Sequence, residues 1–362
     1  MEKYQFIRFN RELKEQVVHL QQYLWGSDLE LNARYLDWKY FQNPYLAQPL
    51  VYLAVYQGQV VGMRGFYGSL WHMGRLEETW EVPVAADAVV HPDHRRKGLY
   101  LRIGEFAEDD LQSQGYAYTL SVSGSPAVRN ANLGRGWNVV GEWQVWYTPG
   151  EKEKPPGFLK RLVDKQSSSK KTDEKSLFWH LDKKNRIGNI SIEKHPRLQA
   201  MAELAGKSGG DHIRHVRDIS FFSWRFDNPF SNYRFLYYGE GNPLGFLVLR
   251  SAQQKGKSRV HIVDWAAEDA HVLSELLAAA KVGYFPGIYI WSGWPSPVEE
   301  SAFTQQGFSN IAVKNSSAPD IHRPTLMVDY FNMTNENKYT PPETKLLDIK
   351  SWHLHGIDSD NH

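Results

Sequence analysis

One stretch of the sequence decides the fold: Val89-Val90-His91-Pro92-Asp93-His94-Arg95-Arg96-Lys97-Gly98-Leu99-Tyr100. Its spacing predicts that a strand over about 82–91 turns into a helix over about 98–114. A helix N-terminus carries unpaired N–H groups and prefers Asp or Glu by roughly 0.3–1 kcal/mol per residue. This helix instead begins after three adjacent cations, Arg95, Arg96 and Lys97. We interpret them as a site for a bound anion such as a diphosphate, with a solvated basic turn as the alternative.

Composition narrows the function further. The 362 residues are enough for about two domains, and 42 Lys plus Arg against 41 Asp plus Glu argue against a binder of duplex nucleic acid. Cysteine is absent, which excludes disulfides, thiolate metal sites and a cysteine nucleophile. No apolar run approaches the 18 residues of a membrane span, and the first residues lack the core of a signal peptide. These features predict a cytoplasmic protein, and they leave the oligomeric state open.

The two halves of the chain resemble each other. Trp38-Lys39-Tyr40-Phe41-Gln42-Asn43-Pro44 and Trp224-Arg225-Phe226-Asp227-Asn228-Pro229 each precede a hairpin, which indicates an internal duplication. A basic, Ser-rich stretch lies between the halves and is typical of a linker. A polar stretch with His353, His355 and His362 near its end is typical of a solvated tail. The predicted boundaries are a first domain at 1–148, a linker at 149–194, a second domain at 195–330 and a polar tail at 331–362.

The deciding stretch also resembles a known loop. Pro92 and Arg95-x-x-Gly98-x-Tyr100 are similar to the acyl-CoA pyrophosphate loop of the GNAT N-acetyltransferase superfamily, whose pattern is Arg/Gln-x-x-Gly-x-Gly/Ala. The predicted order of helices and strands over 1–148 agrees with that family. The resemblance implies an α/β fold with tandem GNAT-like domains, each a mixed, mostly antiparallel twisted sheet flanked by helices. In the second half Glu268 and Asp269 replace the cations, so we assign acyl-CoA binding to the first half.

The resemblance implies acetyl-CoA as the acyl donor and a set of residues that hold it. Backbone N–H groups of the loop strand polarise the thioester carbonyl in the family, and the turn around Ser125 lines the pantetheine channel. The implied binding residues are Val89, Val90, His91, Arg95, Arg96, Lys97, Gly98, Leu99, Tyr100 and Ser125.

Several positions depart from the family pattern. Tyr100 replaces the second loop glycine, Asn132 stands where many members have a tyrosine acid, and Val84 stands where many have a glutamate. Asp87 is the candidate base by its place on the strand alone, and a structural carboxylate is an equal alternative. The catalytic candidates are therefore Asp87 and Asn132. His91 and His94 flank Pro92 with no third ligand nearby, so we expect no metal.

These features predict direct attack of an amine on a bound thioester, because no cysteine can carry an acetyl intermediate. A weak set of bases favours an acceptor of low pKa: deprotonating a lysine-like amine at pH 7 costs about 4–5 kcal/mol, an α-amino group about 1 kcal/mol. The expected function is acetyl-CoA-dependent N-acetylation of a small or carbohydrate-linked amine. The alternatives are an aminoacyl transferase of the peptidoglycan-bridge type and a non-catalytic acyl-CoA-binding module.

Overall fold

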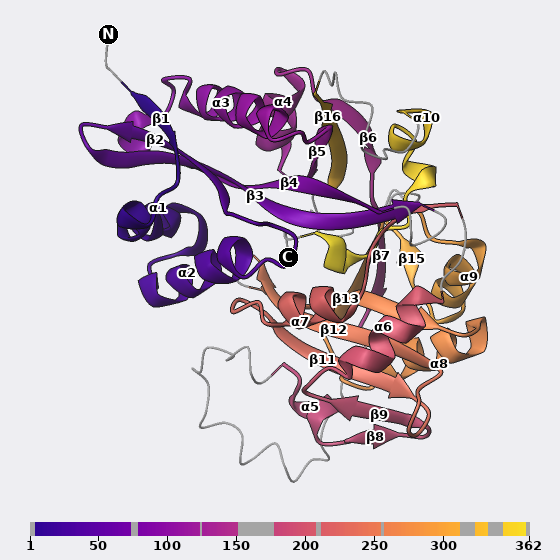
Figure 1. Cartoon of the computed structure of the whole chain (residues 1–362). Helices are drawn as coiled ribbons and strands as arrows, with labels where there is room; N and C mark the ends of the chain where they lie inside the picture. The colour runs from indigo at the N-terminus through magenta and orange to yellow at the C-terminus, as the bar shows by residue number, and fades with distance from the viewer. Residues whose placement is uncertain are drawn as a thin grey trace, which may run out of the picture.

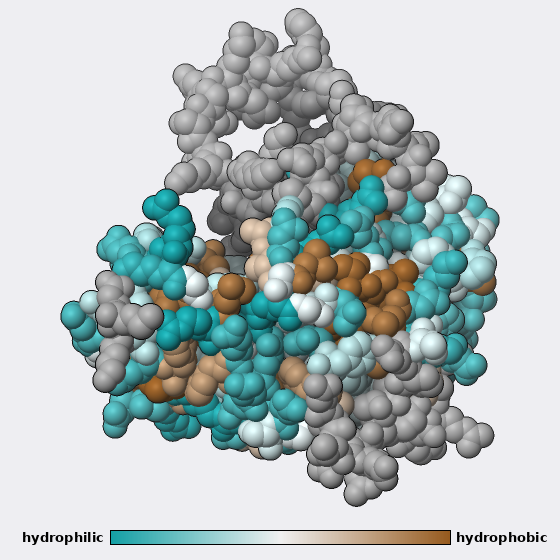
Figure 2. All heavy atoms as spheres, turned by 90° about the horizontal axis from the view of Figure 1, so that it is seen from above, coloured by the Kyte–Doolittle hydropathy of each residue, from teal (hydrophilic) through white to brown (hydrophobic). Residues whose placement is uncertain are grey.

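The computed structural model of the chain describes residues 4–73, 79–123, 125–150, 177–207, 211–254, 257–311, 323–331 and 343–359. Within them the strands form two eight-stranded sheets that lie side by side, the first sheet above the second in Figure 1. Viewed from above, the exposed face is largely hydrophilic and carries a band of hydrophobic side chains (Figure 2). No helix in the described ranges is both long and apolar enough to span a membrane.

The first sheet has the order β1-β2-β3-β4-β5-β16-β6, with β10 paired to β3. Its strands are β1 (Gln5–Arg8), β2 (Leu50–Tyr56), β3 (Gln59–Met73), β4 (Thr79–Val90), β5 (Tyr118–Ser123), β6 (Asn138–Glu142), β10 (Ile213–His215) and β16 (Thr325–Tyr330). Among the described strands of this sheet β4 and β5 form the one parallel pair, with register partners at Val84–Leu120 and Ala85–Ser121. Beyond these pairs β4 continues to Val90 without β5 beside it, so the sheet opens there.

Helices cover both faces of the first sheet. They are η1 (Arg11–Leu13), α1 (Lys14–Trp25), α2 (Leu29–Leu36), the π-helical turn η2 (Asp37–Phe41), η3 (Pro92–His94), α3 (Leu99–Ser113) and α4 (Pro126–Leu133). The alternation along β2 sorts its side chains: Val51 and Leu53 pack with α1, whereas Leu50 and Tyr52 pack with α3. The helices α1 and α3 therefore lie on opposite faces (Figure 1).

The second sheet repeats this plan in the order β15-β7-β14-β13-β12-β11-β9-β8. Its strands are β7 (Gln144–Pro149), β8 (Arg186–Ile187), β9 (Ile190–Glu193), β11 (Asn232–Tyr238), β12 (Gly245–Gln254), β13 (Lys257–Ala267), β14 (Gly287–Ser292) and β15 (Ser309–Asn310). Its helices are α5 (Trp179–Asp182), α6 (Leu198–Gly206), α7 (Ile219–Phe226), α8 (Ala270–Lys281) and α9 (Pro297–Gln305). Again one pair is parallel, β13 with β14. The predicted class, two mixed and mostly antiparallel sheets flanked by helices, is confirmed.

Two strands lie in the sheet of the opposite half. Strand β7, all but the last residue of which belongs to the predicted first domain, pairs with β14 over six residues. Strand β16 falls within the predicted second domain but pairs with β5 on one side and β6 on the other. Hydrophobic periodicity identifies a strand without saying which sheet it joins. The predicted boundaries at 148 and 330 therefore do not coincide with the boundary between the two sheets, because each half contributes one strand to the sheet of the other.

The two halves meet through a reciprocal tryptophan pair. The Trp38 Nε1–H donates to the Trp224 carbonyl oxygen at 2.6 Å, and the Trp224 Nε1–H donates to the Trp38 carbonyl oxygen at 2.7 Å. Their rings stack with centroids 5.0 Å apart and an interplanar angle of 9°. These residues begin the two copies of the sequence repeat, so equivalent positions of the two halves are hydrogen-bonded to and stacked on each other.

Residues 343–359 do not form the solvated tail that we predicted. They contain α10 (Glu343–Leu346), η6 (Ile349–Ser351) and η7 (Gly356–Asp358), and Trp352 and Leu354 are fully buried. Isolated bridges join Trp352 to β10 and His355 to β14, so the segment packs against both sheets. The prediction was wrong here because a few apolar side chains are spread among polar ones. His362 lies outside the described residues.

The predicted linker is also partly folded. Residues 177–194 form α5, β8 and β9, and β9 pairs with β11 at the edge of the second sheet. Residues 151–176 of the predicted linker lie outside the described residues.

Candidate functional site

The loop between β4 and α3 exposes its cations. After η3, Arg96 and Gly98 take left-handed backbone angles, with φ of 61° and 74°. Arg95, Arg96, Lys97 and Gly98 are exposed, and a Cβ added to Gly98 would meet nothing within 4 Å. The Arg95 Nε–H donates to the Val90 carbonyl oxygen at 3.1 Å, which holds the start of the loop to the strand. The N-terminus of α3 is thus open and flanked by positive charge, and binding of an anion there stays a prediction.

Strand β4 carries a bulge close to this loop. Met63 pairs with Val89 and Gly65 with Ala86, so Asp87 and Ala88 together face the single residue Arg64. Asp87 has a φ of 37°, a left-handed angle that costs a non-glycine residue on the order of 1 kcal/mol or more. A residue keeps such a conformation only where its surroundings hold it. This bulge could not be predicted from the sequence, because a bulge is a property of backbone pairing.

Buried partners hold Asp87 in place. Lys39 Nζ donates to one carboxylate oxygen at 2.9 Å, and the Tyr40 hydroxyl donates to the other at 2.9 Å. The side chains of Lys39 and Asp87 are each only 1% exposed. The Lys39 ammonium also lies 5.1–5.8 Å from the ring centroids of Tyr35, Tyr40 and Tyr67. Sequence reasoning missed Lys39, although a lysine inside the aromatic run after Trp38 was a usable signal.

A cleft of about 320 Å³ opens where β4 and β5 stop pairing. Residues from β3, β4, β5, α1 and α4 line it: Leu24, Trp25, Arg64, Ala85, Ala86, Asp87, Ala88, Ser121, Val122, Ser123, Ser125 and Val128. Ser125 caps α4, because its Oγ accepts from the Val128 N–H at 3.4 Å. Of the predicted site residues, this cleft brings together Asp87 and Ser125.

Tyr100 and Asn132 form a chain of hydrogen bonds with Arg64. Arg64 Nη1 donates to the Tyr100 hydroxyl at 2.7 Å, and that hydroxyl donates to Asn132 Oδ1 at 3.0 Å. Asn132 is fully buried and does not line the cleft. These hydrogen bonds connect β3, α3 and α4. Because Asn132 is buried away from the cleft, the structure lends no support to its predicted catalytic role.

One of the predicted carbonyl-polarising amides, that of His91, is bonded within the sheet. Val89 and Val90 lie opposite Met63 and Gly62, and the His91 N–H donates to the Val61 carbonyl oxygen at 2.9 Å. The backbone of Asp87 and Ala88 departs from the regular ladder and lies on the wall of the cleft.

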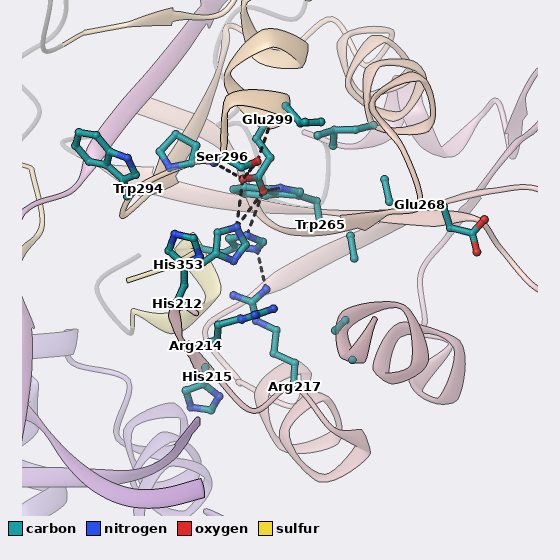
Figure 3. Close-up of a pocket in the computed structure, with 18 of the residues that line it drawn as sticks. His212, Arg214, His215, Arg217, Trp265, Glu268, Trp294, Ser296, Glu299 and His353 are labelled. Atoms are coloured by element: carbon teal, nitrogen blue, oxygen red, sulfur yellow. Dashed lines mark hydrogen bonds and ion pairs between the residues drawn. The ribbon is translucent and has the colours of Figure 1, made fainter. Parts of the chain in front are cut away.

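The second half has a cleft in the equivalent position. A cavity of about 530 Å³ lies beside the ends of β13 and β14 and the N-termini of α8 and α9 (Figure 3). Glu268 and Asp269 stand at the start of α8, and the Asp269 carboxylate accepts from the Val272 N–H at 2.8 Å. The Asp269 carboxylate thus supplies a hydrogen-bond acceptor and a negative charge at the N-terminus of α8. That half therefore has a cleft but no cationic loop at this position.

Two mixed sheets, each with one parallel strand pair and a helix after the first strand of that pair, form a tandem GNAT-like fold. Solved structures bear this out. A GCN5-related N-acetyltransferase from Anabaena variabilis matches with a TM-score of 0.55, 12% sequence identity, 90% coverage of this chain and 72% of that one. A protein from Enterococcus faecalis, titled a probable N-acyltransferase of unknown function, matches with a TM-score of 0.56, 12% identity, 91% coverage of this chain and 72% of its own.

A GCN5-related N-acetyltransferase from Kribbella flavida matches with a TM-score of 0.50, 13% identity, 91% coverage of this chain and 71% of its own. No protein-family model and no curated protein matches the sequence. At these identities the likeness establishes the fold, and the resemblance that predicted it is confirmed at that level.

Proposed function

We propose that the chain is an acyltransferase that moves an acetyl group from acetyl-CoA directly to a primary amine. One observation carries this proposal. The cleft lies at the bulge of β4, and the loop that follows β4 leads to the exposed N-terminus of α3, where three cations stand. A CoA thioester needs both parts, because its diphosphate is anionic and its pantetheine arm is long and narrow.

The loop would hold the diphosphate. The N–H groups at the start of α3 point out of the helix, and Arg96 is exposed beside them. Gly98 leaves the space next to the backbone open, so a phosphate oxygen can approach the N–H groups closely. Tyr100, which replaces the family's second glycine, bonds with Arg64 and Asn132 and is thereby held towards the sheet.

The cleft would hold the thioester. Ser123 and Ser125 lie on one wall and the bulge at Asp87 and Ala88 on the other. Backbone N–H groups at a bulge are fixed dipoles, and aimed at a developing oxyanion they lower a barrier by about 2.7–4 kcal/mol per donor. In this view Asp87 is a positioning residue: its bonds to Lys39 and Tyr40 fix the bulge.

The transfer then requires a neutral amine. The amine nitrogen attacks the carbonyl carbon, the carbon–sulfur bond breaks, CoA leaves as a thiolate, and the new amide loses its extra proton to water. A thiol pKa near 8.5 makes the thiolate an acceptable leaving group without an acid at Asn132. Lys39 and Tyr40 each donate a hydrogen bond to the Asp87 carboxylate, so Asp87 is poorly placed to act as a general base. The proposal therefore favours an acceptor amine of low pKa, which is already neutral in larger part at pH 7.

Calorimetric titration with acetyl-CoA tests the proposal. We expect Arg96→Glu to weaken binding by about 10–100-fold, because a charged hydrogen bond is worth about 1.5–3 kcal/mol. Arg11→Glu is the matched control, since Arg11 is also exposed but belongs to neither loop nor cleft, and it should leave the Kd unchanged.

Thiol release in the presence of an amine panel then tests catalysis. Acetylation by the native chain that falls with Arg96→Glu supports the proposal. Binding without acetylation of any amine would identify an acyl-CoA-binding module instead. Failure to bind acetyl-CoA would contradict both and favour the aminoacyl-transferase alternative.

A further inference from the structure

Three side chains with metal-ligand chemistry meet in the cleft of the second half. Glu299 stands in the first turn of α9, and His353 and His355 come from the C-terminal segment, about 50 residues later in the sequence. His353 Nε2 lies 3.2 Å from each Glu299 carboxylate oxygen, and His355 Nε2 lies 3.7 Å from Glu299 Oε1. The three ligand atoms all lie within 4.8 Å of one another. Figure 3 shows Glu299 and His353 facing each other at the cavity.

His355 offers an unpartnered nitrogen to this cluster. Its side chain is 2% exposed, and its Nε2 makes no hydrogen bond. Its Nδ1 lies 2.7 Å from Asp264 Oδ1 and 2.8 Å from Arg217 Nη1. Arg217 Nη1 also lies 2.9 Å from the same Asp264 oxygen and donates to it. In the tautomer that donates its Nδ1–H to Asp264, Nε2 carries a buried lone pair that faces the Glu299 carboxylate, and a cation between the two would stabilise that arrangement.

The carboxylate of Glu299 is oriented for one further ligand. Its Oε2 accepts from both the N–H and the hydroxyl of Ser296 at 2.8 Å, which fills that oxygen. Its Oε1 accepts from the Trp265 Nε1–H at 2.7 Å and keeps one lone pair towards the histidines. The Trp265 ring also stacks on His355 with centroids 3.7 Å apart, which fixes the imidazole.

The charge around the cluster favours a cation. Arg217 pairs with the carboxylates of both Asp264 and Asp358, so these three groups and Glu299 together carry a net charge of minus two. Among the other residues that line the cavity, Arg214 and Lys350 add two positive charges and Asp218, Glu268 and Asp269 add three negative ones, so the sum stays negative.

We propose that Glu299, His353 and His355 bind one divalent transition-metal ion of the zinc type. Two histidines and one carboxylate are a zinc ligand set, and ligand atoms about 2.0–2.1 Å from a tetrahedral ion lie roughly 3.3 Å apart. The separations of 3.2 and 3.7 Å from Glu299 to the two histidines are close to that value, and all three ligand atoms lie within 4.8 Å of one another. Asp264 is the carboxylate that orients a metal-binding histidine. The fourth position faces the cavity of about 530 Å³ and takes water or a small anion.

This proposal replaces our expectation that the chain binds no metal. That expectation rested on His91 and His94, which have no third ligand. The proposed ligands are far apart in sequence, and two of them lie in the segment that we predicted to be solvated. The site is independent of the acyl-CoA cleft, so either proposal can fail without the other.

Metal uptake by the full chain tests the site. The protein is treated with a chelator, incubated with ZnCl2, desalted and analysed by mass spectrometry of the metal. We expect one zinc ion per chain, a higher Tm with zinc, and visible absorption when Co²⁺ replaces it. A native chain that retains no zinc after desalting overturns the proposal without any variant.

Variants locate the ion. His353→Gln removes a side chain that is 20% exposed, and we expect it to weaken zinc binding by more than about 100-fold, since outer partners alone are worth 10–100-fold. His212→Gln is the matched control, because His212 lines the same cavity outside the cluster. Equal zinc uptake by the two variants would place the ion elsewhere and overturn the assignment. If His353→Gln does not fold, zinc uptake by Asp264→Asn is compared with that of His212→Gln, because Asp264 contacts the Nδ1 atom of the ligand His355.

Discussion

The reciprocal pair of Trp38 and Trp224 makes a testable contribution to stability. Trp38→Phe removes the 2.6 Å hydrogen bond to the Trp224 carbonyl, which still accepts from the Asp227 N–H at 3.2 Å. The loss of that bond therefore lies at the low end of the usual 1–3 kcal/mol. The smaller ring also loses packing in a site that is 2% exposed, which adds about 1–2 kcal/mol. We expect a total decrease of about 2–3 kcal/mol in the free energy of unfolding.

Equilibrium unfolding in urea, followed by circular dichroism, measures this effect. Trp224→Phe should cost a similar amount, because it removes the matching 2.7 Å bond. The double variant should cost less than the sum by about 0.5–1.5 kcal/mol, since the two rings share one stack. Trp179→Phe is the control at a ring that is 50% exposed, with an expected change below about 0.5 kcal/mol. Costs below 0.5 kcal/mol for both single variants, or strict additivity in the double, would refute the reasoning.

Three further predictions follow from the buried charges and the loop. Asp87→Asn leaves the Lys39 ammonium buried without its carboxylate, so we expect a loss of about 3–5 kcal/mol in urea unfolding, against a negligible change for the exposed Asp93→Asn. Gly98→Ala, at a φ of 74°, should cost about 1 kcal/mol and weaken acetyl-CoA binding, whereas Gly134→Ala, at a φ of −62°, should do neither. Burial, with Arg250 and Arg259 nearby, lowers the pKa of His261 to about 3. Below about pH 6.5 this histidine is therefore protonated in the unfolded chain but stays neutral in the folded chain. Stability should fall by about 1.4 kcal/mol per pH unit from this group as the pH drops from about 6.5 towards 3, and His261→Gln should reduce that slope in urea titrations at several pH values.

The sequence predicted those parts of the fold whose signals are local. The helix expected over 98–114 is observed as Leu99–Ser113, because its apolar spacing and flanking glycines lie within one short window. The repeat around Trp38 and Trp224 was visible because identical residues recur in the same order. These signals were enough to predict two mixed sheets and an exposed cationic loop.

Other features depend on contacts between distant residues. The partner of Asp87 is Lys39, 48 positions away, and no periodicity links them. The C-terminal segment is polar in composition, yet four of its apolar side chains, Leu346, Trp352, Leu354 and Ile357, are buried. The zinc ligands could not be grouped from the sequence either, because Glu299 joins His353 and His355 only through tertiary packing.

The placement of β16 between β5 and β6 has a consequence for how the chain assembles. Strand β5 ends at Ser123 and β16 begins at Thr325, so 201 residues, 124 to 324, are synthesised before the missing neighbour of β5 exists. An N-terminal fragment released at residue 150 would leave β5 and β6 with open edges, and open edges promote aggregation. Each half therefore depends on the other while the polypeptide is being made, and separately expressed halves should become soluble only when they are produced together.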